Sequence, residues 1–149
     1  MARFRFRLQN ILNIKLKMET QARQEFANAR KALDREEEHL AMLQRRGEEI
    51  QREGVELRSG VLDFHAIRDN ETGRMLNEQR IREQQIVIKR AGAVLEKARQ
   101  NLEDAIKERK IYERLRERAF DEFMVEENRA ESKVIDELTT YTYGQKGAQ

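Results

Sequence analysis

The sequence of 149 residues contains no cysteine, no proline and no tryptophan. Without cysteine the chain has neither a disulfide framework nor thiol chemistry, which fits a reducing compartment. Without proline it lacks the commonest helix breaker. Aromatic residues make up only 6% of the chain, which is little for the core of a globular domain. These absences favour long helices over a compact fold.

Long apolar runs are also missing. No stretch approaches the roughly 18 apolar residues that span a bilayer, and the basic beginning lacks the apolar run of a signal peptide. Charge is abundant, at 39% of residues, but it is balanced to a net +2. The signs are unevenly placed, because residues 1–18 carry five basic residues and no acid, whereas residues 119–138 carry seven acids and two basic residues. Such ends indicate either mutual contact or separate partners.

The chain does contain two long heptad patterns. From Leu8 to Phe64 mostly apolar residues recur at alternating spacings of four and three, between charged neighbours. A second pattern runs from Ile81 to Phe123. Both are typical of coiled-coil seams. Together they predict an all-α fold, a long antiparallel two-helix coiled-coil hairpin without any strand.

The second seam contains one irregularity. Beyond Tyr112 the apolar spacing passes through Leu115 and Ala119, which predicts a stutter in the coiled coil. The seam is then predicted to continue through Ala130 and Leu138, past the residues that the first helix can cover.

Two segments could form the turn of the hairpin. In Arg58–Asp63, Gly60 would end the first helix and Asp63 would cap the second; Asp69–Gly73 has three turn-forming residues in five. The first segment is preferred, which predicts a single domain over 1–149. Its first helix spans about 4–58, so that Arg3–Leu8 begins this helix, the turn about 59–63, the second helix about 64–141 and a disordered tail 142–149.

The sequence offers no set of residues for catalysis. His39 and His65 are the only histidines, and neither has a second metal ligand at helical spacing. There is no glycine-rich phosphate loop, and acid pairs such as Glu126–Glu127 are predicted to be solvated. Basic stretches such as "KERKIYERLRER" are interrupted by acids, which argues against nucleic-acid binding. We therefore expect no enzyme, no metal and no cofactor.

One end of the hairpin is unusually apolar. Phe120, Phe123, Met124 and Val125 are too many large side chains for one narrow seam, and Phe4, Phe6 and Leu8 join them at the same end. Phe123 lies on the predicted seam, whereas Phe120 and Met124 lie off it, with no intramolecular hole to fill. The cluster is interpreted either as a plug between the helices or as a tip that inserts into another protein, and the two can coexist.

Three features resemble the flagellar FliJ family, namely "FRFRLQNILNIK" at 4–15, the glycine at the mid-chain turn, and "RLRERAFDEFMVEENRAESKVIDEL" at 114–138. The resemblance implies a non-enzymatic stalk of the bacterial flagellar export apparatus, similar in fold to the rotor shaft of rotary ATPases. It further implies a cytoplasmic protein, peripherally associated with the membrane at the flagellar base. The partners implied are the hexameric export ATPase, the membrane export gate and substrate chaperones.

The same resemblance assigns residues to two contacts. For the export gate, Leu76 matches the family, whereas Asp69 and Thr72 stand where many members have aromatics. The residues implied for docking in the ATPase ring are Phe4, Phe6, Leu8, Phe120, Phe123, Met124, Glu127, Glu131, Lys133, Asp136 and Glu137. Those implied for the export gate are His39, Leu43, Arg46, Ile50, Thr72, Leu76 and Gln79.

Other interpretations of the coiled coil remain open. The chain could be the equivalent stalk of a virulence type III secretion system, or a shaft subunit of a V-type ATPase. It could also be a generic coiled-coil scaffold. The Phe-x-Phe start and the Asp-Glu finish favour the flagellar stalk over the virulence-system stalk and the V-type shaft subunit.

Overall fold

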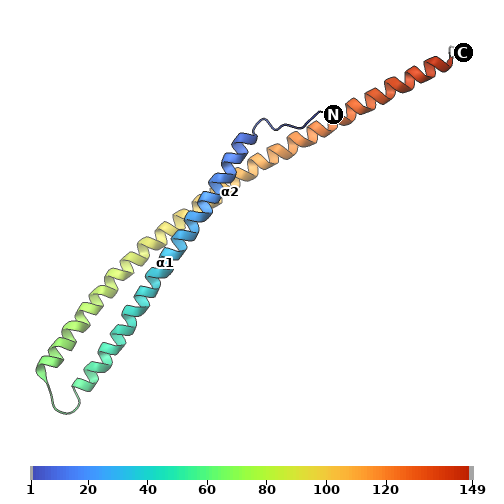
Figure 1. Cartoon of the computed structure of the whole chain (residues 1–149). Helices are drawn as coiled ribbons and strands as arrows, with labels where there is room; N and C mark the ends of the chain where they lie inside the picture. Colours follow the sequence, from blue (N-terminus) through green and yellow to red (C-terminus); the bar gives the residue numbers. More distant parts are fainter. Residues whose placement is uncertain (1, 148–149) are drawn as a thin grey trace. The chain divides into compact units, whose positions relative to one another are not determined.

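The computed structural model describes residues 2–147, and two helices account for nearly all of them. Helix α1 spans Gln9–Leu57 and helix α2 spans Phe64–Gly147 (Figure 1). Within the described part of the chain no residue lies in a strand. The predicted all-α class is therefore confirmed. Neither helix contains an apolar stretch long enough to cross a membrane.

The chain divides into two units, each with its own contacts between the helices. One unit is Gln21–Glu103, and the other combines Met1–Thr20 with Asp104–Gln149. In both, α1 and α2 run in opposite directions where they pack together, as in the predicted antiparallel hairpin. We call them the turn unit and the terminal unit.

The turn of the turn unit forms where the preferred prediction placed it. Gly60 has a φ of 86°, in the left-handed region that glycine adopts at no steric cost. Asp63 then caps α2, since its Oδ1 accepts hydrogen bonds from the backbone amides of His65 and Ala66 at 3.1 and 3.2 Å. The alternative segment, Asp69–Gly73, lies inside α2. Val61 and Phe64 are 99% and 73% exposed, so the first seam ends at Leu57 rather than at Phe64.

Three side-chain amides of α2 bind α1 at intervals of seven residues. Asn70 donates to the carbonyl oxygen of Ile50 at 2.9 Å, and Asn77 donates to that of Leu43 at 3.0 Å. Gln84 donates to that of Glu36 at 2.9 Å. We call these three bonds the amide ladder. Because donors and acceptors both advance by one heptad, the ladder fixes the register of the two helices, a role that buried asparagine has in other coiled coils.

Two glycines of α1 make room for the ladder. A Cβ atom on Gly54 would lie 2.7 Å from Oδ1 of Asn70, and one on Gly47 would lie 3.0 Å from Nδ2 of Asn77. At the third rung the matching residue of α1 is Leu40, and the donor is glutamine, which is longer by one methylene. The glycines therefore allow the shorter asparagine amides to reach the α1 backbone.

The terminal unit corrects two predicted helix ends. Helix α1 begins at Gln9 rather than at residue 4, and residues 2–6 have no regular structure. Along Arg3–Leu8 the arginines are exposed while Phe4, Phe6 and Leu8 are half-buried, so the apolar side of this segment packs on the unit. Helix α2 continues to Gly147, so residues 142–147 are helical rather than disordered. Residues 148 and 149 lie outside the described residues.

Candidate partner-binding surfaces

An aromatic cluster joins the beginning of the chain to α2 in the terminal unit. The ring of Phe4 meets that of Phe120 edge to face, with 5.2 Å between centroids, and lies 5.5 Å from that of Phe123. The guanidinium of Arg116 lies 5.5 Å from the centroid of Phe4, within reach of a cation–π interaction. Phe4 reaches both rings from outside the helix, because α1 begins only at Gln9.

The cluster is only partly enclosed. Phe4, Phe6 and Phe123 are half-buried, whereas Phe120 and Met124 remain 43% and 41% exposed. The expectation that Phe120 has no intramolecular hole to fill is wrong, because its ring packs on Phe4. The cluster is thus a plug on one side and an exposed apolar surface on the other. Insertion of this surface into another protein stays a prediction.

Helix α2 continues well beyond the aromatic cluster without cover from the described residues. Every residue of 128–147 is exposed, which includes Val134, Leu138 and Tyr141. The prediction that Ala130, Val134 and Leu138 continue the seam is therefore wrong, because no part of α1 packs against them. The residues assigned to the ATPase ring that lie here are Glu131, Lys133, Asp136 and Glu137, all exposed, after the half-buried Glu127.

Charged residues occupy the seam of the terminal unit next to the aromatic cluster. Lys15 donates to Glu108 at 2.7 Å, and this hydrogen bond raises the pKa of Lys15 above its ordinary value. Arg109 forms ion pairs with Glu19 and, at 2.7 Å, with Glu113. The side chain of Glu19 is 8% exposed and that of Arg109 is 19% exposed. A nearly buried carboxylate needs such a partner, because an unpaired charge in this position would be costly.

The predicted stutter near Tyr112 is absent. Leu115 is 37% exposed, and the residue that contacts the other segment is Arg116, which donates to Gln9 at 3.1 Å. The heptad thus continues through Arg109, Arg116 and Phe123. A search for apolar residues does not find Arg109 and Arg116. Their positions in the seam can still be recognised, because Leu102, Arg109, Arg116 and Phe123 are each seven residues apart.

The residues assigned to the export gate lie in the turn unit and do not form one exposed patch. Ile50 is 5% exposed and Leu43 is half-buried, because both belong to the seam. Arg46 pairs with Glu49 and Glu53 at 3.1 and 3.5 Å. The members of the set that a partner can reach are His39, Arg46, Thr72, Leu76 and Gln79.

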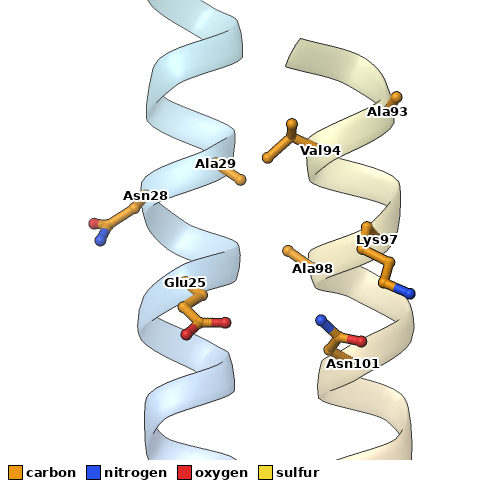
Figure 2. Close-up of a pocket in the computed structure, with 8 residues that line it drawn as sticks. All are labelled: Glu25, Asn28, Ala29, Ala93, Val94, Lys97, Ala98 and Asn101. Carbon is orange, nitrogen blue, oxygen red and sulfur yellow. The ribbon is translucent and has the colours of Figure 1, made fainter. Parts of the chain in front are cut away.

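A shallow hollow of about 670 Å³ lies between the helices of the turn unit. Figure 2 shows that the small side chains of Ala29 and Ala98 face each other across the gap between the helices. The hollow exists because alanine fills little of the space there. Its other lining residues are Glu25, Asn28, Ala93, Val94, Lys97 and Asn101.

The sequence comparisons support a single family. A family model described as "Flagellar FliJ protein" matches residues 4–148 of the 149-residue chain. No curated protein matches, and no solved structure does. The matched range includes both helices, the turn and the aromatic cluster.

Proposed function

Because the chain belongs to the FliJ family and is a component of the flagellar export apparatus, we propose that it is the stalk of that apparatus. In this proposal the terminal unit binds the hexameric export ATPase and promotes its assembly and turnover. The turn unit contacts the membrane export gate, and the protein also binds substrate chaperones. The stalk works at the cytoplasmic face of the membrane and carries out no catalysis itself.

The observation that carries this proposal is the half-covered aromatic cluster. Phe4 holds Phe120 and Phe123 in place, while Phe120 and Met124 present apolar surface to solvent. Rigid aromatic anchors that are already positioned are the residues that dominate protein interfaces. The exposed helix that follows adds Glu131, Asp136 and Glu137, which would pair with basic residues of a partner.

The gate contact would use exposed residues of the turn unit. Leu76 is 46% exposed, and His39 and Gln79 are exposed as well. We therefore propose that Leu76 is its apolar anchor, with His39 and Gln79 at its edge. Leu43 and Ile50 would act indirectly, by holding the two helices together.

A binding titration with the flagellar export ATPase tests the proposal. We expect Met124→Asp to weaken binding more than tenfold, because it places a carboxylate in the exposed apolar surface. Met42→Asp is the matched control, since Met42 is an exposed methionine of the turn unit. Equal affinities for the two variants would refute docking through the terminal unit. Selective binding to a V-type or virulence-system ATPase would favour those alternatives instead.

A further inference from the structure

The segment "KERKIYERLRER" at 107–118 sorts its charges by helix face in the structure. In the sequence its cations are interrupted by three acids. Two of these acids are bound by cations of the seam, since Glu108 pairs with Lys15 and Glu113 with Arg109, each at 2.7 Å. The interruption by acids that the sequence shows therefore does not extend to every face of the helix.

The side of α2 that faces away from α1 carries a row of cations. Lys107, Ile111, Arg114 and Arg118 are spaced four, three and four apart, so they share one face of the helix. We call this face the outer stripe. Each of its residues lies two positions after a seam residue, which is about 200° round an α-helix. The seam residues concerned are Ala105, Arg109, Tyr112 and Arg116. The outer stripe is therefore opposite the seam.

The outer stripe is open to solvent and its charges are not neutralised. All four residues are exposed, and Ile111 is 56% exposed. Lys110 and Leu115, at the two edges of the stripe, are exposed as well. None of the four cations of the stripe and its edge forms an ion pair with a residue of 2–147. The structure thus leaves them available to an anion from outside.

These cations also repel one another. Lys110, Arg114 and Arg118 are each four residues apart, a spacing at which like charges destabilise a helix. Glu117, the third acid of the segment, lies about 100° round the helix from Arg118 and pairs with none of them in the described chain. A row of like charges without internal partners is the electrostatic footprint of an anion-binding surface.

Ile111, in the middle of the row, indicates which kind of anion fits. An aliphatic side chain gains nothing from a phosphate backbone in water, and the outer stripe has no aromatic side chain on which a base could stack. Among lipid headgroups, by contrast, cations bind the phosphates while an aliphatic side chain enters the apolar boundary below them. A basic amphipathic helix is typical of proteins that bind a membrane surface.

We propose that the outer stripe binds the surface of a membrane through the headgroups of anionic phospholipids. Lys107, Arg114 and Arg118 contact phosphates, and Ile111 lies between the headgroups. The next positions at helical spacing are Asp104 and Glu122, so the contact is limited to about 11 residues, or roughly 17 Å of helix.

Two further arguments concern the choice of partner. A straight row on one helix, opposite the seam, matches a flat surface better than a pocket of an acidic protein. The stalk is also proposed to work at the membrane, and this second argument rests on the proposed function. Phe120 lies two residues after Arg118, about 200° round the helix, so the lipid contact and the ATPase contact use different faces of α2.

Co-sedimentation of the full chain with lipid vesicles tests the proposal. We expect at least tenfold tighter binding to vesicles of equal parts phosphatidylglycerol and phosphatidylcholine than to phosphatidylcholine alone, and weaker binding as salt is added. Arg114→Glu/Arg118→Glu should weaken binding to the anionic vesicles at least tenfold. Lys31→Glu/Arg35→Glu is the matched control, because it changes two exposed cations of the turn unit with the same spacing and the same loss of charge. It should bind nearly as tightly as the wild type.

Two milder variants separate the lipid contact from folding and from net charge. Arg114→Gln/Arg118→Gln should melt no lower than the wild type, because it removes a like-charge repulsion, and should still weaken vesicle binding at least threefold. Ile111→Ser keeps every charge and should also weaken vesicle binding at least threefold. Circular dichroism verifies that all variants are helical.

Several results would overturn the proposal. They are equal binding of the wild type to both kinds of vesicle, an equal loss in the two charge-reversed variants, and an unchanged affinity in Ile111→Ser. Tighter binding to single-stranded RNA or to polyglutamate than to anionic vesicles would assign the stripe to a different partner. The vesicles contain neither the ATPase nor the export gate, so this proposal and the proposed function can fail independently.

Discussion

The ring of Phe4 meets the ring of Phe120 edge to face, at 5.2 Å between their centroids. The two residues are 116 positions apart, and Phe4 lies before the first helix begins. This contact holds the beginning of the chain against α2 and leaves part of Phe120 exposed. We therefore expect Phe120, Phe123 and Met124 to contribute differently to stability and, if the proposed docking is right, to binding.

Alanine substitutions separate these roles. Phe123→Ala should lower the free energy of unfolding by about 1–3 kcal/mol, less than the roughly 3–5 of a closed core. Phe120→Ala should cost about 0.5–1.5 kcal/mol, the value of an aromatic pair, and Met124→Ala less than about 0.5. Chemical denaturation of the three variants measures this order. If Met124→Ala proves as destabilising as Phe123→Ala, Met124 is part of the plug and not an exposed anchor.

The close approach of Asn70 to Gly54 predicts that substitutions at these two residues have non-additive effects on stability. Alanine normally stabilises a helix by about 1 kcal/mol over glycine, but at Gly54 its Cβ would lie 2.7 Å from Asn70 and 2.9 Å from Arg58. Gly54→Ala alone should therefore bring no gain, whereas in an Asn70→Ala background it should stabilise. A double-mutant cycle should give a coupling of at least about 0.5 kcal/mol.

Gly92 is the control for this cycle. It lies in the same unit, and a Cβ there meets nothing within 4 Å, so Gly92→Ala should stabilise by about 1 kcal/mol. Equal gains at Gly54 and Gly92 would mean that Asn70 moves aside without cost, and that the amide ladder does not constrain the register.

Acid should weaken the ion pairs that Glu71 and Glu96 form within α2. Arg74 lowers the pKa of Glu71 below its ordinary value of 4.5, and Arg99 does the same for Glu96, in each case mainly through a side-chain hydrogen bond. A carboxyl group with a lowered native pKa stabilises the fold above pH 4.5, and this contribution is lost as the pH falls through the lowered pKa. Glu71→Gln/Glu96→Gln should thus melt lower than the wild type at neutral pH but equally at about pH 2.

The control for the acid titration is Glu48→Gln. Glu48 has no ion-pair partner within residues 2–147. The melting temperature of the Glu48→Gln variant should therefore equal that of the wild type at both pH values. A gap between the double variant and the wild type that persists in acid would show that the effect is not electrostatic.

Local signals in the sequence predicted the turn correctly, because Gly60 and Asp63 act through their own backbone conformation and capping. The amide ladder was missed, since a search for apolar periodicity skips polar residues at seam positions. The seven-residue spacing of Asn70, Asn77 and Gln84, opposite Gly47 and Gly54, was nevertheless visible. Polar residues at heptad intervals are thus evidence for a seam.

The ends of the chain were harder to predict, for physical reasons. The alternation of Arg3–Leu8 belongs to a segment outside the helix, and its contact with Phe120 and Phe123, through Phe4, is distant in the sequence. At the other end, residues 142–147 are helical although they were expected to be disordered, and the hydroxyl groups of Thr139, Thr140 and Thr142 are accommodated by donating to carbonyls four residues earlier at 2.8–2.9 Å. The apolar residues around Phe120 could be recognised from the local sequence. The contact of Phe4 with Phe120 and Phe123 could not, because these residues are far apart in the sequence.

The turnover of the flagellar export ATPase, measured with and without this protein, tests the stalk most directly. The purified chain should hydrolyse no ATP by itself. Added to the ATPase, it should raise turnover by favouring the assembled hexamer, and Met124→Asp should abolish most of that increase while Met42→Asp does not. If the wild-type chain leaves both assembly and turnover unchanged, it is not the stalk of the export ATPase.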